Sequence, residues 1–128
     1  MKSYRILIVD KEASFGSSLC RILEEAGAGY RTQCAASMRE AREIAVSFKP
    51  HLVVTDVLLT DGDGCDLYTE LRDENPQLPF LFLCAHDEEA ARLRGLDFPP
   101  VKWLGRREAA EMIASRVESA LSRAYDRG

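Results

Sequence analysis

One short segment, Leu52–Asp56, constrains the fold more than any other part of the chain. It reads Leu-Val-Val-Thr-Asp, so it is almost continuously apolar until its last residue. A strand of this kind is usually buried on both faces, as strands are in a parallel sheet covered by helices. The segment therefore predicts a parallel sheet, with the Asp56 carboxylate where a buried strand ends.

Short apolar runs alternate with helical patterns along the whole chain. The runs predict strands at Arg5–Asp10, Tyr30–Cys34, Leu52–Asp56, Phe80–Cys84 and Phe98–Val101. Between and after them, the spacing of apolar residues predicts helices at about Phe15–Ala26, Ser37–Pro50, Gly64–Glu74, Asp87–Arg94 and Arg106–Tyr125. Because Pro99 and Pro100 cannot donate to a ladder, the last strand is expected at an edge. This alternation predicts an α/β fold, a doubly wound five-stranded parallel sheet flanked by five helices.

The chain predicts a single domain over residues 1–128, with no output domain within them, because no repeat or linker divides it. Its 17 basic and 21 acidic residues are interleaved and give a net charge of −4. No concentrated basic face is available for nucleic acid, so direct binding of nucleic acid is not expected.

Neither a membrane span nor a signal peptide is expected. The longest apolar run, Phe80–Ala85, is too short to cross a bilayer, and the residues after Met1 do not lead into a signal-peptide core. The protein is therefore expected in the cytoplasm, where thiols are kept reduced. The four cysteines form no C-x-x-C pair and are interpreted as small reduced core residues: Cys20, Cys34, Cys65 and Cys84.

Polar residues gather where the predicted strands end. Asp10 and Asp56 end the first and third strands, and Glu12 lies two residues after Asp10. Cys84 ends the fourth strand, and Lys102 follows the predicted fifth. Doubly wound sheets bind ligands at this edge. Clustered carboxylates repel one another, so such a set indicates a cation, a proton or a function that compensates.

The chain resembles the receiver domain of bacterial two-component response regulators over essentially its whole length. The residues that carry the resemblance are Ile6–Asp10, Pro50–Asp56, the Asp63-Gly64 turn and Lys102. The resemblance implies a flavodoxin-like (receiver) topology and a signalling domain rather than an enzyme.

The resemblance also implies roles for individual residues. Asp56 would be phosphorylated by a histidine kinase or phosphotransfer partner, and Lys102 would contact the phosphoryl group. Asp10, Asp56 and Glu12, the last as a substitute ligand, would hold Mg²⁺. Cys84 occupies the position of the switch hydroxyl. Phosphorylation would alter the surface of the fourth helix, fifth strand and fifth helix, which would contact a downstream protein, an output domain or a second copy.

Several positions depart from the family pattern. Lys11 stands where the family usually has a second adjacent acid that ligates Mg²⁺, and a protonated amine cannot ligate a metal. Lys11 could instead pair with Asp56 and supply positive charge. Cys84 is only a weak donor, and Trp103 follows Lys102 where the family usually has proline. These departures predict an atypical receiver with weakened or lost Mg²⁺-dependent phosphorylation.

Two alternatives remain beside a phosphorylated receiver. One is a phosphorylation-independent pseudo-receiver that acts as a protein-interaction module, with Trp103 either packing over its loop or anchoring a partner. The other is a flavodoxin-like flavin binder, which would need a hydroxyl- and glycine-rich loop where this chain has Asp10–Ser14. A calcium loop at Asp61–Gly64 would have Leu59 where a carboxylate is needed, so a turn is predicted there.

Overall fold

The computed structural model describes residues 3–26, 29–84, 89, 93, 102–105 and 110–126, and at 102, 103 and 110 it describes the backbone only. The strands are β1 (Arg5–Val9), β2 (Arg31–Ala35), β3 (Leu52–Asp56), β4 (Leu58–Leu59), β5 (Gly62–Asp63), β6 (Phe80–Cys84) and β7 (Lys102–Gly105). The helices with described bounds are α1 (Ala13–Glu25), α2 (Met38–Phe48), α3 (Gly64–Glu74) and α5 (Ala110–Tyr125).

Five of the strands form one sheet in the order β2-β1-β3-β6-β7, and every neighbouring pair is parallel. This order confirms the predicted doubly wound sheet. Leu52–Asp56 is β3, the central strand, and all of its residues are buried. The last strand, β7, lies at an edge of the sheet, which is the position predicted for the fifth strand.

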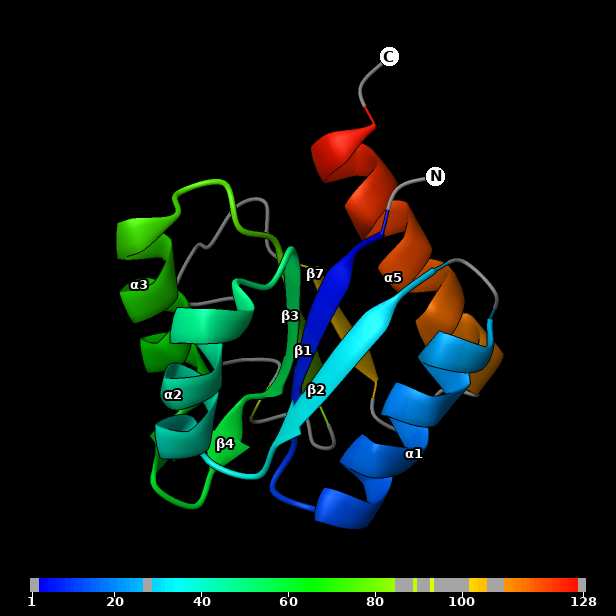
Figure 1. Ribbon diagram of the computed structural model, residues 1–128. Helices are drawn as coiled ribbons and strands as arrows, with labels where there is room; N and C mark the ends of the chain where they lie inside the picture. The colour runs from blue at the N-terminus through cyan, green and yellow to red at the C-terminus, as the bar shows by residue number, and fades with distance from the viewer. Residues whose placement is uncertain are drawn as a thin grey trace.

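Helices cover both faces of the sheet. In Figure 1, α1 and α5 lie on one face and α2 and α3 on the other. Alternate residues of each strand point to opposite faces, so the sheet divides the core into two clusters. Leu7, Val53 and Phe82 belong to the cluster beneath α2 and α3, whereas Ile8 and Val54 belong to the cluster beneath α1 and α5.

The fifth strand lies later in the chain than its sequence predicts. Lys102–Gly105 pairs with Leu81–Cys84, and Leu104 is fully buried in the cluster beneath α1 and α5. The prediction that Lys102 follows the strand is wrong, because Lys102 is its first residue. The segment Phe98–Val101 lies outside the described residues, as does most of the helix predicted at Asp87–Arg94, where Glu89 and Leu93 are described as helical and buried.

A short antiparallel hairpin follows β3 and was not expected as strand structure. Leu58 pairs with Asp63 and Leu59 with Gly62, so Thr60 and Asp61 form the turn between β4 and β5. The turn predicted at Asp61–Gly64 is therefore only partly correct, because Gly62 and Asp63 belong to β5 and Gly64 begins α3. The hairpin leads directly into α3, whose first turn is capped by the Asp63 carboxylate, 2.7 Å from the Cys65 nitrogen.

A disulfide joins Cys20 of α1 to Cys34 of the edge strand β2. The prediction that these two cysteines are reduced is therefore wrong, while Cys65 and Cys84 are buried free cysteines as predicted. The spacing of the pair in sequence gives no sign of the bond. It forms because α1 packs across the strands that precede and follow it. A second contact between α1 and β2 is made by the Glu24 carboxylate, which accepts hydrogen bonds from the Thr32 N–H at 3.0 Å and from the Thr32 hydroxyl at 2.6 Å.

We expect Gly64→Ala to destabilise the fold. A Cβ at Gly64 would overlap the carbonyl oxygen of Asp56, and this backbone atom cannot move without disturbing the end of β3. The expected loss in the free energy of unfolding is about 1–3 kcal/mol, measured by urea denaturation. Gly16→Ala is the matched control, because a Cβ there makes ordinary contacts, the closest 3.5 Å from the Asp10 Cβ. Equal stability of the two variants would contradict the prediction.

Candidate functional site

The ladder between β1 and β3 brings two acidic residues together. Val9 pairs with Thr55, so Asp10 and Asp56 are neighbours at the carboxyl edge of the sheet. Both side chains are buried, with exposed fractions of 1% and 2%. Two buried carboxylates on adjacent strands repel each other, so the surrounding groups must stabilise their charge.

Backbone N–H groups of the loop after β1 contribute to this stabilisation. The Lys11 N–H donates to Oδ2 of Asp56 at 3.0 Å, and the Glu12 N–H donates to Oδ1 of Asp10 at 2.8 Å. A hydrogen bond to an ionised acceptor contributes more than a neutral one. The loop between β1 and α1 thus contacts both acids through its backbone and orients the Asp56 carboxylate.

The side chains of the same loop lie outside this contact. Lys11 and Glu12 are both exposed, and Glu12 is the residue that precedes α1 as its N-cap. Within the described part of the chain, the Lys11 ammonium forms no ion pair with Asp56. The predicted contact between Lys11 and Asp56 is therefore made by the amide of Lys11 instead of its amine.

The neighbour of β3 in the sheet, β6, places Cys84 near the two acids. Asp56 pairs with Leu83, and Cys84 is the next residue and the last of β6. Its side chain is buried in the cluster beneath α2 and α3. The residue at the position of the family's switch hydroxyl is thus a buried thiol at the predicted edge of the sheet.

Lys102 is displaced from that edge. The register pairs Lys102 with Leu81, whereas Asp56 pairs with Leu83. Two residues along a strand correspond to about 7 Å, so the backbone of Lys102 lies that far short of the level of Asp56. Gly105 pairs with Cys84 and ends β7. The residue that follows in sequence is Arg106, which lies outside the described residues.

The donor set does not fit a magnesium centre built from three carboxylates. Across residues 3–26, 29–84 and the shorter described stretches, no group of three or more His, Cys, Asp or Glu is placed to hold a metal. Asp10 and Asp56 supply two buried acids, but Glu12 is exposed. Magnesium usually binds through few carboxylates plus water, and it dehydrates reluctantly. A positive side chain at Lys11 opposes its binding further.

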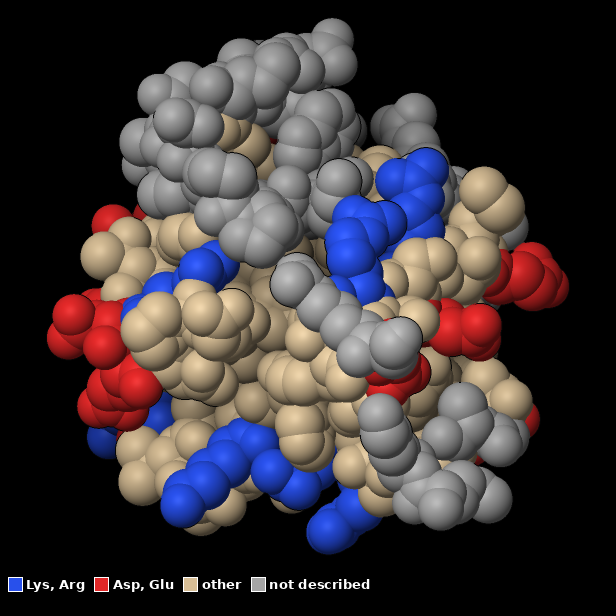
Figure 2. Space-filling view, turned by 90° about the horizontal axis from the view of Figure 1, so that it is seen from above, with Lys and Arg blue, Asp and Glu red and all other residues tan. Residues whose placement is uncertain are grey.

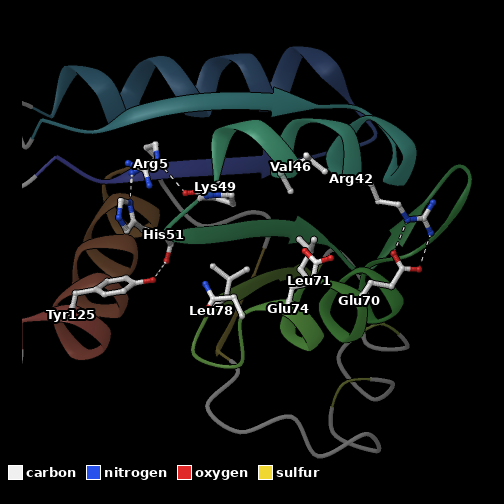
Figure 3. A pocket seen from close by; sticks show the side chains of 13 residues that line it. Arg5, Arg42, Val46, Lys49, His51, Glu70, Leu71, Glu74, Leu78 and Tyr125 are labelled. Carbon is white, nitrogen blue, oxygen red and sulfur yellow. Dashed lines mark hydrogen bonds and ion pairs between the residues drawn. The ribbon is translucent and has the colours of Figure 1, made fainter.

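A cavity of about 690 Å³ lies elsewhere, between α2 and α3 toward the amino ends of the strands (Figure 3). One end is formed by Arg5, His51 and Tyr125, whose hydroxyl donates to the His51 carbonyl at 2.7 Å. Burial, with a smaller effect of the Arg5 charge, lowers the pKa of His51. Arg42 and Glu70 form an ion pair of 2.6 Å at the other end. Sequence patterns gave no signal for this cavity, because its walls come from four separate segments.

Among the described residues on the face shown in Figure 2, charged side chains form no extended patch of one sign. Basic and acidic side chains form small separate groups with uncharged surface between them. This distribution agrees with the interleaved charges of the sequence. Every helix in the described part of the chain is too short or too polar to span a membrane.

Comparison with known proteins identifies the family. Residues 6–118 match the model of the response regulator receiver domain. The chain is 34% identical over 119 residues to the response regulator MprA of Mycolicibacterium vanbaalenii, an alignment that covers 93% of this chain and 51% of that protein. It is also 34% identical to MprA of Mycobacterium ulcerans, with 94% and 51% covered. The chain thus spans about half the length of these curated relatives.

Solved structures agree with the sequence relatives. The non-phosphorylated HemR receiver domain from Leptospira biflexa superposes with a TM-score of 0.81 at 31% identity, covering 93% of this chain and 94% of that one. A receiver domain protein from Methanospirillum hungatei has a TM-score of 0.84 at 20% identity, covering 99% and 100%, and supports the fold alone. With its parallel five-stranded sheet and its acids at the carboxyl edge, the chain belongs to the response regulator receiver domain family.

Proposed function

We propose that this domain accepts a phosphoryl group on Asp56 from a histidine kinase or a phosphotransfer protein, and in response changes a protein-interaction surface. The observation that carries the proposal is the buried Asp56 carboxylate at the end of the central strand, beside Asp10 and oriented by the Lys11 N–H. The family assignment supports the same function. We also propose a cytoplasmic location, where such partners present their phosphohistidine, although disulfides such as Cys20–Cys34 are rare in that compartment.

The proposed chemistry is a displacement at phosphorus. A carboxylate oxygen of Asp56 attacks the phosphorus of a phosphohistidine, the new O–P bond forms, and the N–P bond breaks to release the histidine. Both reactants are anionic, so the reaction needs positive charge or N–H donors near the transferred group. The Lys11 N–H donates to Oδ2 of Asp56, next to the atom that would bond to phosphorus. The exposed Lys11 side chain supplies positive charge on the same loop.

The surface proposed to respond comprises the fourth helix, β7 and α5. Only parts of it are described, and on α5 Met112 is half-exposed although its neighbour Ile113 is buried. We propose that this surface contacts a downstream protein, an output domain or a second copy. A flavin-binding role is not proposed, because acidic residues occupy the loop where a flavin phosphate would need donors.

A second candidate function is phosphorylation-independent binding of a partner protein. Lys11 favours this candidate, because it replaces an acid where the metal centre of the family would form, and the described residues offer no three-carboxylate cluster. In that case Asp56 and Asp10 hold the loop after β1 in place, and the partner binds whether or not Asp56 carries a phosphoryl group.

Phosphorylation of Asp56 is tested with acetyl phosphate and intact mass spectrometry. We expect slow, incomplete addition of one phosphoryl group, and none in Asp56→Asn, because that variant lacks the nucleophilic oxygen pair. Prompt and stoichiometric addition would show that the site is not weakened. Addition that persists in Asp56→Asn would place the reaction on another residue.

The same variants separate the two candidate functions. A partner recovered by cross-linking from the source cell is compared for binding to wild type, to acetyl-phosphate-treated wild type and to Asp56→Ala. Binding to treated wild type that differs from binding to both untreated wild type and Asp56→Ala supports the phosphorylated receiver. Binding that is equal in all three supports the interaction module.

Lys11→Asp is expected to strengthen the dependence on magnesium. The substitution removes a positive charge and adds a third carboxylate to the loop that contacts Asp10 and Asp56, which are the two buried acids of the site. We expect the rate of phosphorylation by acetyl phosphate at millimolar Mg²⁺ to rise about ten-fold, equivalent to about 1.4 kcal/mol in the barrier. Lys49→Asp makes the same charge change at an exposed residue after α2 and is the control. No difference between the two variants would remove Lys11 as the cause of weak phosphorylation.

The basic residue that contacts the phosphoryl group is tested by comparing two positions. Lys102 begins β7, whereas Arg106 follows its carboxyl end in sequence, so we propose Arg106 as the more important charge. Arg106→Ala is expected to slow phosphorylation about ten-fold or more, and Lys102→Ala less than two-fold, in the same mass assay. The reverse order would restore the role that the sequence predicts for Lys102.

A further inference from the structure

The hairpin that follows Asp56 is attached to the start of α2. The carboxylate of Asp61, in the hairpin turn, accepts the Met38 N–H at 2.8 Å and the Arg39 N–H at 3.0 Å. The Ser37 hydroxyl oxygen accepts the N–H of Glu40, the next residue, at 3.2 Å. The first amides of a helix have no partner within the helix. In α2 these amides donate to two residues: the cap residue Ser37, and Asp61, which lies more than twenty positions later in the sequence.

This contact is electrostatic as well as geometric. The helix N-terminus carries partial positive charge, which stabilises an anion placed against it. The Met38 and Arg39 amides accordingly lower the pKa of Asp61, with a smaller effect from the Arg42 charge. The adjacent Gly62 lies directly against the buried Met38 side chain, where a Cβ would overlap its sulfur. The turn therefore contacts α2 through both polar and apolar groups.

The other end of the hairpin is attached to Asp56. The Gly64 N–H donates to the Val57 carbonyl at 2.6 Å, and Gly64 lies against the Asp56 carbonyl. The hairpin residues Val57 and Leu59 are buried in the cluster beneath α2 and α3. Because its base, its sides and its turn are all held, the hairpin connects the backbone of Asp56 to α2 with little freedom between them.

We propose that Asp61 is a positioning residue that couples the loop carrying Asp56 to α2, so that a change at Asp56 alters α2 and a partner bound to α2 alters Asp56. Energetic coupling between two sites is reciprocal. Through Asp63 the same hairpin caps α3, so both helices that form the walls of the cavity in Figure 3 begin at contacts with it. The effect on Asp56 reactivity rests on the proposed phosphorylation, whereas the structural coupling does not.

The structural coupling is tested by amide hydrogen exchange, measured by NMR without any phosphodonor. We expect Asp61→Ala to raise exchange at Met38 and Arg39 about ten-fold, because two charge-assisted hydrogen bonds are lost. Asp61→Asn keeps one acceptor oxygen and should fall between. Asp73→Asn removes an exposed carboxylate of α3 and is the matched control, with no effect expected at α2. Because Asp61 is exposed, each variant should fold, which circular dichroism verifies.

Coupling to Asp56 requires a double-mutant cycle. Asp56→Asn is expected to change exchange at Met38 and Arg39 when Asp61 is present, and to leave it unchanged in the Asp61→Ala background. An equal effect in both backgrounds, or none in either, would overturn the proposal.

The rate of phosphorylation by acetyl phosphate is then compared for wild type, Asp61→Asn and Asp61→Ala. A graded fall of several-fold to about ten-fold, with Asp73→Asn unchanged, is the expected result. A normal rate in Asp61→Ala would overturn the effect on reactivity. If wild type itself is not phosphorylated, the proposed function fails, while the exchange experiment still decides the coupling.

Discussion

The parallel ladder between β1 and β3 is the constraint on which the rest of the structure depends. Both strands are buried on both faces, so their register cannot slip without moving apolar side chains to the wrong cluster. The register that satisfies burial also aligns the residues that end the strands. Asp10 and Asp56 are therefore brought together by the packing of the core, and the loop after β1 can bind both through its amides.

The charge of this acidic pair must be balanced by the groups around it. Two buried carboxylates need compensation, and the backbone supplies part of it through the Lys11 and Glu12 amides. Lys11 adds a positive side chain beside the pair where a third carboxylate would otherwise attract a divalent cation. Its exposed position means that the compensation is long-range and screened by salt. The two amides therefore hold both acids in place through the backbone of the loop after β1.

The predictions from sequence succeeded where local pattern and tertiary packing impose the same requirement. The apolar run of β3, the cap at Ser37 and the spacing of α5 each predicted an element that the structure contains. They failed where several local patterns were equally compatible with the sequence. The strand predicted at Phe98–Val101 was weak because it contains Pro99 and Pro100, and that segment lies outside the described residues. The fifth strand of the sheet is Lys102–Gly105, whose register is set by pairing with β6 and by burial of Leu104.

Contacts between elements far apart in the sequence were the hardest to predict. Nothing in the spacing of Cys20 and Cys34 indicates a disulfide, which depends on how α1 crosses β2. Asp61 belongs to a stretch that predicts only a turn, and its role at the start of α2 depends on where the hairpin lies.

By itself, the sequence determined the class of fold, the order of its elements and the acids at the carboxyl edge, because apolar periodicity and strand ends are local properties. The tertiary structure decided which oxygen each amide reaches, which strand end Lys102 occupies and which helix Asp61 caps. Those outcomes depend on register and packing between distant segments, and no local pattern encodes them.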